Sequence, residues 1–111
     1  MNSLKDLISC KSFVGGKWID DPKEGNLDIL DKYDQTVLAS IPFLNTSQIE
    51  QAVKTSEDAF KTMSQWSAGQ RALKLEKLYE LLNEKKELFT ELICKEAGKP
   101  VAYARAEMER C

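Results

Sequence analysis

The sequence predicts an α+β fold, with β-hairpins at the start of the chain and three to four helices after them. Short apolar stretches separated by turn residues fill the first 42 residues, and apolar side chains recur at helical intervals from about residue 49 onward. No repeat, low-complexity tract or linker divides the chain. We therefore treat residues 1–111 as a single segment and expect residues 1–12 to be flexible.

The first expected element is a tight hairpin. Residues 13–14 and 17–19 are rich in apolar side chains and flank Gly15 and Gly16. Such a glycine pair tolerates the positive φ angles that a two-residue hairpin turn requires. Residues 20–26 then combine Asp, Pro, Gly and Asn, which predicts a polar loop.

A second hairpin is expected after this loop. Apolar residues alternate with aspartates over residues 27–30, and a second apolar stretch covers residues 37–41. Residues 33–36 have the composition of a turn between them. Pro42 then marks either the end of the second strand or an unpaired edge position.

The first predicted helix has a single apolar face. Two capping boxes could begin it, Asn45 with Gln48 or Ser47 with Glu50, and the pattern does not choose between them. A polar break over residues 64–69 ends it. The side chains that fall on the apolar face are Ile49, Ala52, Val53, Phe60 and Met63.

A longer helix is expected from about Gln70 until a polar run over residues 83–87. Its apolar stripe consists of Leu75, Leu78, Tyr79 and Leu82. An amphipathic helix must bury such a stripe against another layer. We therefore expect these four side chains in the core, and the alternative is a partner-binding face exposed because the rest of the core is absent.

Further helical residues follow in two runs. One run covers residues 88–97 and stops at Gly98, with Pro100 just beyond, which is a strong stop signal. The other run covers residues 101–111, and its apolar stripe extends to the last residue without a capping residue or loop after it. We therefore expect this last helix to continue beyond Cys111 in a longer protein. The stripe consists of Val101, Ala104, Met108 and Cys111.

Composition and charge exclude several classes of function. Hydrophobic residues make up 42% and charged residues 31%, as in soluble globular proteins. The 16 basic residues are interleaved with 18 acidic ones, which argues against nucleic acid or an anionic membrane as partner. No window approaches the roughly 18 apolar residues of a membrane span, and no secretory signal is recognisable.

Few residues in the chain are suited to catalysis. Histidine is absent, and neither G-x-G-x-x-G nor G-x-x-x-x-G-K followed by Ser or Thr occurs. Cys10, Cys94 and Cys111 match no metal motif and lack a histidine base, so we interpret them as buried or incidental reduced thiols of a cytoplasmic protein. Trp18 and Trp66 are expected to be packing anchors.

The order of these segments resembles the start of the aldehyde dehydrogenase superfamily. Residues 13–19 resemble its opening hairpin, residues 37–42 the strand that follows, and residues 49–60 its first helix. Residues 96–100 resemble the E-x-G-K-P segment, and residues 106–110 the start of the next helix. The resemblance places the segment in the α/β NAD(P)-binding domain of that fold.

One turn departs from the family pattern. Most members have N-P-x-T-G, where this chain has Asp31, Lys32, Tyr33, Asp34 and Gln35. The variant is more similar to the lactaldehyde and glyceraldehyde type of dehydrogenase than to the betaine type. A turn does not define a substrate class.

The resemblance implies an enzyme that oxidises an aldehyde to a carboxylic acid with NAD or NADP. In the family, a cysteine thiolate attacks the carbonyl and hydride passes to the nicotinamide. A glutamate-activated water then releases the acid, and an asparagine and a backbone N–H hold the oxyanion. All of these groups lie beyond Cys111, so the resemblance assigns no catalytic and no cofactor-binding residue to this chain. Its partners would be the remainder of the dehydrogenase and an aldehyde, in a homodimer or homotetramer.

The resemblance also suggests a minor metal site. In several members the acidic residue of E-x-G-K-P, here Glu96, binds a monovalent cation together with backbone carbonyls, here of Ile29 or Leu30. An oxygen cage suits a hard cation. We nevertheless favour an ordinary helix-end ion pair between Glu96 and Lys99.

The alternative to the dehydrogenase fragment is a small α-rich interaction module without enzymatic activity.

Overall fold

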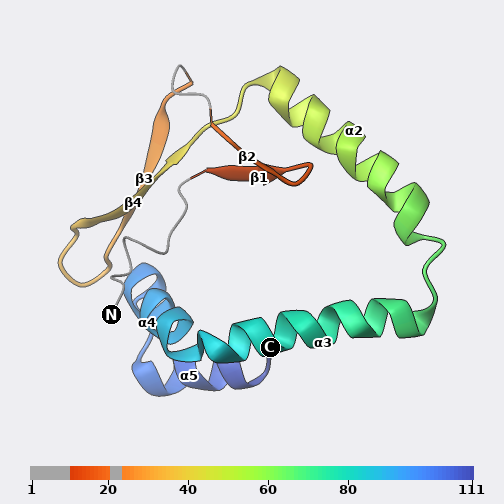
Figure 1. The fold of residues 1–111 in the computed structure, drawn as a ribbon. Coiled ribbons are helices and arrows are strands. Elements are labelled where there is room, and N and C mark those ends of the chain that lie inside the picture. The colour runs from red at the N-terminus through yellow and green to blue at the C-terminus, as the bar shows by residue number, and fades with distance from the viewer. Residues whose placement is uncertain (1–10, 21–23) are drawn as a thin grey trace.

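The computed structural model describes residues 11–20 and 24–111, and the chain runs around an open ring (Figure 1). Two antiparallel hairpins precede four helices in this part of the chain, which confirms the predicted α+β order. The elements are β1 (Ser12–Val14), β2 (Lys17–Ile19), β3 (Asn26–Leu30), β4 (Val37–Pro42), α2 (Thr46–Met63), α3 (Ala68–Glu84), α4 (Lys86–Ala97) and α5 (Val101–Glu109). Two stretches lie outside the described residues. They are residues 1–10, which include Cys10 and most of the segment expected to be flexible, and residues 21–23 of the expected loop.

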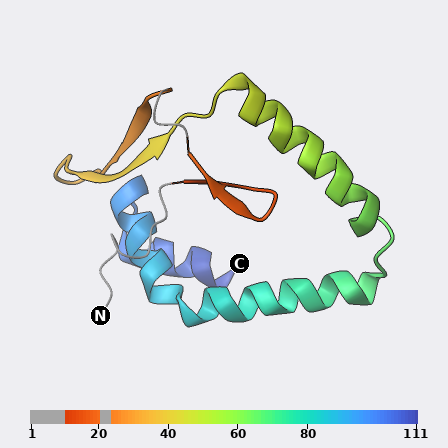
Figure 2. The same cartoon turned by 45° about the horizontal axis from the view of Figure 1, so that its top comes forward.

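The β1–β2 hairpin has the predicted glycine turn. Gly15 and Gly16 adopt φ angles of 58° and 78°, which non-glycine residues rarely adopt. Phe13 pairs with Trp18 across the strands, and their rings lie 4.9 Å apart at an interplanar angle of 55°. The turn approaches α2 so closely that a Cβ atom on Gly15 would lie 3.1 Å from Cγ2 of Thr55. The turn of this hairpin is therefore directed towards α2, and the hairpin lies within the ring (Figure 2).

The β3–β4 hairpin is closed by a longer turn. The backbone N–H of Asp31 donates to the carbonyl of Thr36 at 2.8 Å, and the N–H of Gln35 donates to the carbonyl of Asp31 at 2.9 Å. Gln35 has a φ of 63°, the one positive φ at a non-glycine residue in the described chain. Pro42 is the last residue of β4 and faces Asn26, so it marks the strand end and not an unpaired edge.

Capping boxes begin both long helices. At α2 the Asn45 side chain accepts from the N–H of Gln48 at 2.9 Å, and the Gln48 side chain accepts from the N–H of Asn45 at 3.0 Å. Of the two boxes that the sequence allowed, the structure thus selects the first. At α3 the side chains of Ser67 and Gln70 exchange the same pair of bonds at 3.2 and 2.8 Å. This box starts α3 at Ala68, two residues before the predicted start.

The predicted helix stops are confirmed at both ends of α4. Lys85 separates α3 from α4, and Gly98 ends α4 in the left-handed region with a φ of 68°. The N–H of Gly98 donates to the carbonyl of Cys94 at 2.9 Å, which satisfies one of the free carbonyls at the helix end.

The last helix is shorter than the apolar stripe suggested. α5 ends at Glu109, and the N–H of Arg110 bonds to the carbonyl of Glu107 at 3.1 Å in a tightened last turn. Cys111 therefore lies outside α5, and the expectation that it belongs to the helical stripe is wrong.

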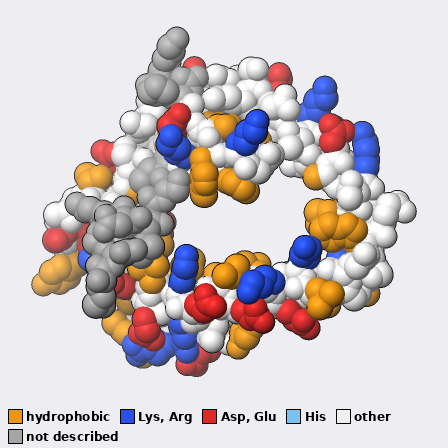
Figure 3. All heavy atoms as spheres, viewed as in Figure 1, with side chains coloured by type: hydrophobic (Ala, Val, Ile, Leu, Met, Phe, Trp, Pro, Cys, Tyr) orange, Lys and Arg blue, Asp and Glu red, His pale blue; other side chains and the backbone are white. Residues whose placement is uncertain are grey.

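The structure buries little of its apolar surface. The chain exposes 8641 Å², whereas a compact monomer of this mass exposes about 6,200 Å². Its radius of gyration is 16.9 Å, against about 13 Å for a compact domain of this length. Ala104 is fully buried, but large apolar side chains elsewhere line the inner rim of the ring (Figure 3). No helix in the described part of the chain has both the length and the apolar composition needed to cross a bilayer.

The apolar stripe of α3 is the main error of the sequence prediction. Leu75, Leu78 and Tyr79 were expected in the core, yet each is more than half exposed, and Leu82 is only half-buried. The physical reason is that, among residues 11–20 and 24–111, no other element packs closely along α3. Trp18, which we expected to be a packing anchor, is also more than half exposed, despite its ring contact with Phe13.

Candidate functional site

The β3–β4 turn packs against the C-terminal end of α4. The backbone N–H of Lys32 donates to the carbonyl of Lys95 at 2.9 Å. A Cβ atom on Gly98 would lie 3.2 Å from Cβ of Lys32, so only glycine fits here without displacing the turn. This contact joins segments that are more than 60 residues apart in the sequence, and it places the end of β3 beside the last turn of α4.

Two aspartates shape this turn. Asp31 is 8% exposed, and its side chain accepts from the N–H of Tyr33 at 2.9 Å. The carboxylate of Asp34 accepts from the hydroxyl of Thr36 at 2.7 Å and from its N–H at 2.9 Å. These bonds, aided by the charge of Lys95, lower the pKa of Asp34 from its ordinary value. These hydrogen bonds hold the turn in place beside the C-terminal end of α4.

The predicted cation ligands lie on the two elements that meet at this turn. Ile29 is half-buried in β3, and Glu96 is exposed in the last turn of α4. The ion pair between Glu96 and Lys99 that we favoured is wrong, because the Lys99 ammonium donates to Glu107 of α5 instead. Within residues 11–20 and 24–111, no three His, Cys, Asp or Glu residues gather as metal ligands.

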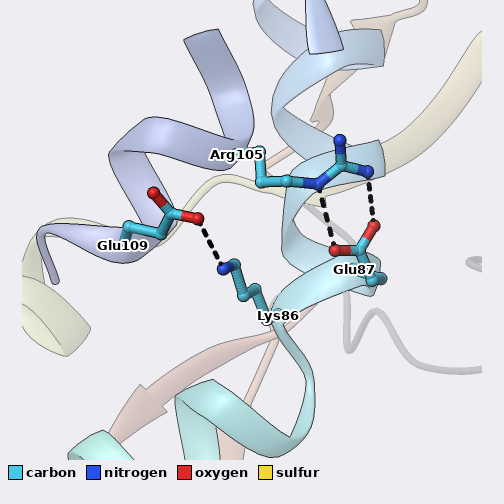
Figure 4. A network of polar contacts seen from close by, with 4 residues as sticks. All are labelled: Lys86, Glu87, Arg105 and Glu109. Atoms are coloured by element: carbon cyan, nitrogen blue, oxygen red, sulfur yellow. Dashed lines mark hydrogen bonds and ion pairs between the residues drawn. The ribbon is translucent and has the colours of Figure 1, made fainter. Parts of the chain in front are cut away.

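Ion pairs hold α5 against α4 (Figure 4). The guanidinium of Arg105 donates from Nε and Nη2 to the two carboxylate oxygens of Glu87, at 3.2 and 2.9 Å. Lys86 Nζ donates to Glu109 at 3.0 Å. The two-point bond lowers the pKa of Glu87 and raises that of Arg105. Sequence reasoning missed these pairs because their partners are 18 and 23 residues apart and no local spacing signals them.

Another candidate functional feature is the exposed apolar surface of α2 and α3. In α2, Ile49, Val53 and Phe60 are each more than half exposed. A groove on α3 combines apolar side chains with few charges, and its lining residues are Leu75, Glu76, Leu78, Tyr79, Glu80, Leu82 and Cys111. Contiguous apolar surface of this kind marks a site of association with other protein surface rather than a catalytic centre.

The described cysteines lie away from any recognised nucleophile motif. Cys94 is half-buried in α4, and Cys111 is exposed at the edge of the α3 groove. Both are free thiols. We predicted buried or incidental thiols, and neither of these two is fully buried.

The sequence matches the model of the aldehyde dehydrogenase family over residues 18–111. Among individual relatives, malonate-semialdehyde dehydrogenase 2 of Oceanobacillus iheyensis is 33% identical over 100 residues, which cover 90% of this chain and 21% of the relative. The succinate-semialdehyde dehydrogenase [NADP(+)] 2 of Schizosaccharomyces pombe is 27% identical over 106 residues. The chain therefore spans about a fifth of the length of the relatives it matches.

The fold has the same relationship to solved structures. An aldehyde dehydrogenase from Brucella melitensis biovar abortus 2308 superposes with a TM-score of 0.87 at 29% identity. The alignment covers 97% of this chain and 23% of that one. The ring-shaped path of the chain is thus one part of a larger known fold.

Proposed function

Because the chain belongs to the aldehyde dehydrogenase family, we propose that it is a segment of an enzyme that oxidises an aldehyde to a carboxylic acid with NAD or NADP. The observation that carries this proposal is the exposed apolar surface of α2 and α3 in a chain about a fifth as long as its relatives. The rest of the enzyme covers that surface. The complete protein is a cytoplasmic homodimer or homotetramer.

The role of this segment is structural. It packs two hairpins and four helices onto the cofactor-binding domain, and the catalytic groups come from elsewhere in the enzyme. The described residues do not fit a dinucleotide themselves, because the grooves on α3 are lined by side chains of this helix with Trp66 or Cys111, and no glycine-rich loop for the pyrophosphate lies among these residues. We therefore assign no step of hydride transfer to them.

The test compares the 111-residue chain with the protein encoded by the complete gene. The complete protein is expected to reduce NAD(P)+ in the presence of an aldehyde, and the 111-residue chain is expected to give no turnover and no tight dinucleotide binding. The measurements are NAD(P)H absorbance and calorimetric titration. Turnover by the short chain, or a gene that ends at Cys111, would contradict the proposal.

The competing interaction module makes a different prediction for the isolated chain. A self-contained module melts cooperatively as a monomer, whereas a segment with bare helix faces self-associates and binds apolar dyes. The comparisons give the module no support. Sedimentation and a thermal melt of the chain distinguish the two.

We also propose the monovalent cation site at Glu96 and the carbonyl of Ile29 or Leu30. Its support is that β3 ends beside the last turn of α4, where the helix dipole presents partial negative charge. In the complete enzyme, replacing Na+ or K+ by tetramethylammonium is expected to lower Tm, and Glu96→Gln is expected to remove that difference. Equal Tm values in all salts would refute the site.

A further inference from the structure

Helix α3 carries apolar side chains on two opposite sides. Leu73 and Leu75 are each 65% exposed, and two residues correspond to about 200° of rotation around an α-helix. Two separate grooves follow from this arrangement. The groove on the side of Leu75 is described above, and the other is lined by Trp66, Gln70, Leu73, Lys74 and Lys77. The two grooves share no lining residue.

Helix α2 provides a contrast within the same chain. Its exposed apolar side chains, Ile49, Val53, Phe60 and Met63, follow one another at intervals that keep them on one side of the helix. A helix with one apolar side belongs at a protein surface. When a helix has apolar residues on two opposite sides, both can leave water only if each side is covered.

We infer that α3 is inserted between two layers of the complete protein, so that both of its grooves are covered by the same polypeptide beyond Cys111. This inference rests on the proposed function and extends it to the groove of Trp66 and Leu73. About four-fifths of the length of the relatives lies outside this chain, which is ample for two layers.

The charges around the second groove define its occupant. Lys77 is paired with Glu80 of its own helix at 2.9 Å, whereas Lys74 makes no ion pair with any residue that the structure describes. The occupant is therefore an apolar segment that brings a carboxylate to Lys74. Pairing at the rim of a buried contact fixes its register more than it adds stability.

The test uses two matched substitutions in the protein encoded by the complete gene. Leu73→Lys and Leu75→Lys change the same residue type at the same starting exposure on opposite sides of α3. Both are expected to lower Tm by several degrees and by similar amounts. Lys54→Glu, on the polar side of α2, is the control and is expected to leave Tm unchanged. If either lysine variant does not fold, Leu73→Ala and Leu75→Ala are used instead, and both are again expected to lower Tm by similar amounts.

The outcomes separate the two proposals. If Leu75→Lys lowers Tm and Leu73→Lys does not, the second layer is absent and the inference is overturned, while the proposed function stands. If neither substitution lowers Tm, the proposed function itself fails. If Leu73→Lys dissociates subunits at unchanged Tm, the occupant is a second subunit, which also overturns the inference.

Discussion

The two halves of the helical region differ in how they are held. α4 and α5 pack on each other around Ala104 and are tied together by ion pairs, and α4 also contacts β3. α2 and α3 have stronger local signals, with a complete capping box at each start. They nevertheless belong to none of the closely packed pairs of elements in the described chain. Good local signals therefore define where a helix begins, and tertiary packing decides how firmly it is held.

The two halves also differ in whether the chain itself covers their apolar side chains. The α4–α5 pair covers part of its own surface, because Ala104 is fully buried where the two helices pack together. The apolar faces of α2 and α3 are left uncovered by the residues that the structure describes, and we propose that further protein surface covers them.

The largest effect is expected at the contact between α4 and α5. Ala104 is 0% exposed, so Ala104→Leu has no space for its larger side chain and is expected to cost about 2 kcal/mol. Amide hydrogen exchange of the chain, compared separately for α4 with α5 and for α2, measures this local cost. The matched change in the other half, Ala52→Leu in α2, is expected to cost little. Equal costs at both sites would show that the two halves are held alike.

The next largest effect is expected at the helix stop. Gly98→Ala forces a side chain into the left-handed region and against Lys32, which is expected to destabilise the chain by about 1–2 kcal/mol. Gly69→Ala in α3 is the control. Gly69 has no positive φ and no side-chain neighbour closer than 3.9 Å, so alanine there is expected to stabilise the helix slightly. An equal loss of stability in Gly98→Ala and Gly69→Ala would contradict the role of Gly98 as a helix stop.

A smaller, pH-dependent effect is expected from Glu87. The hydrogen bond from Arg105 lowers the pKa of Glu87 below its ordinary value of 4.5. The ion pair therefore contributes its full stabilisation of the folded state when the pH is above 4.5. The contribution is lost as the pH falls through the lowered pKa of the folded state. NMR titration of the carboxyl groups should show Glu87 returning towards 4.5 in Arg105→Gln, with Asp34 unchanged. An unaltered Glu87 titration would refute the ion pair.

The smallest effect is expected from the α3 stripe in the isolated chain. Leu78 is already half exposed, so Leu78→Ser should change the stability of the 111-residue chain by less than about 0.5 kcal/mol. The same substitution in the complete protein is expected to cost several times more, because we propose that the leucine is covered there. Denaturant titration of both proteins provides the comparison, and a large cost in the short chain would contradict it.

Local features of the fold were predictable from the sequence, and long-range ones were not. Glycine pairs, capping residues and helix stops act within a few residues, so the hairpins and the end of α4 at Gly98 were predicted correctly. The bond from Lys32 to Lys95 and the pairs of Arg105 depend on tertiary approach, which no spacing encodes. The stripe at Leu75 was correctly recognised as apolar, but its place in a core was wrong because periodicity does not reveal whether the second layer belongs to the same chain.

The same limit applies to the candidate site. The family resemblance indicated Glu96 and Ile29, and the contact between β3 and α4 brings their elements together. The expected pair with Lys99 failed because α5 offers Glu107 to the same ammonium, a competition that only the folded structure reveals.

Amide hydrogen exchange of the isolated 111-residue chain, measured helix by helix and repeated in the complete protein, tests the central claim most directly. We expect the amides of α3 to exchange much faster than those of α4 and α5 in the short chain, and to become as well protected as theirs in the complete protein. Equal, strong protection of all four helices in a monomeric short chain would contradict the claim that α3 depends on a layer from outside this segment.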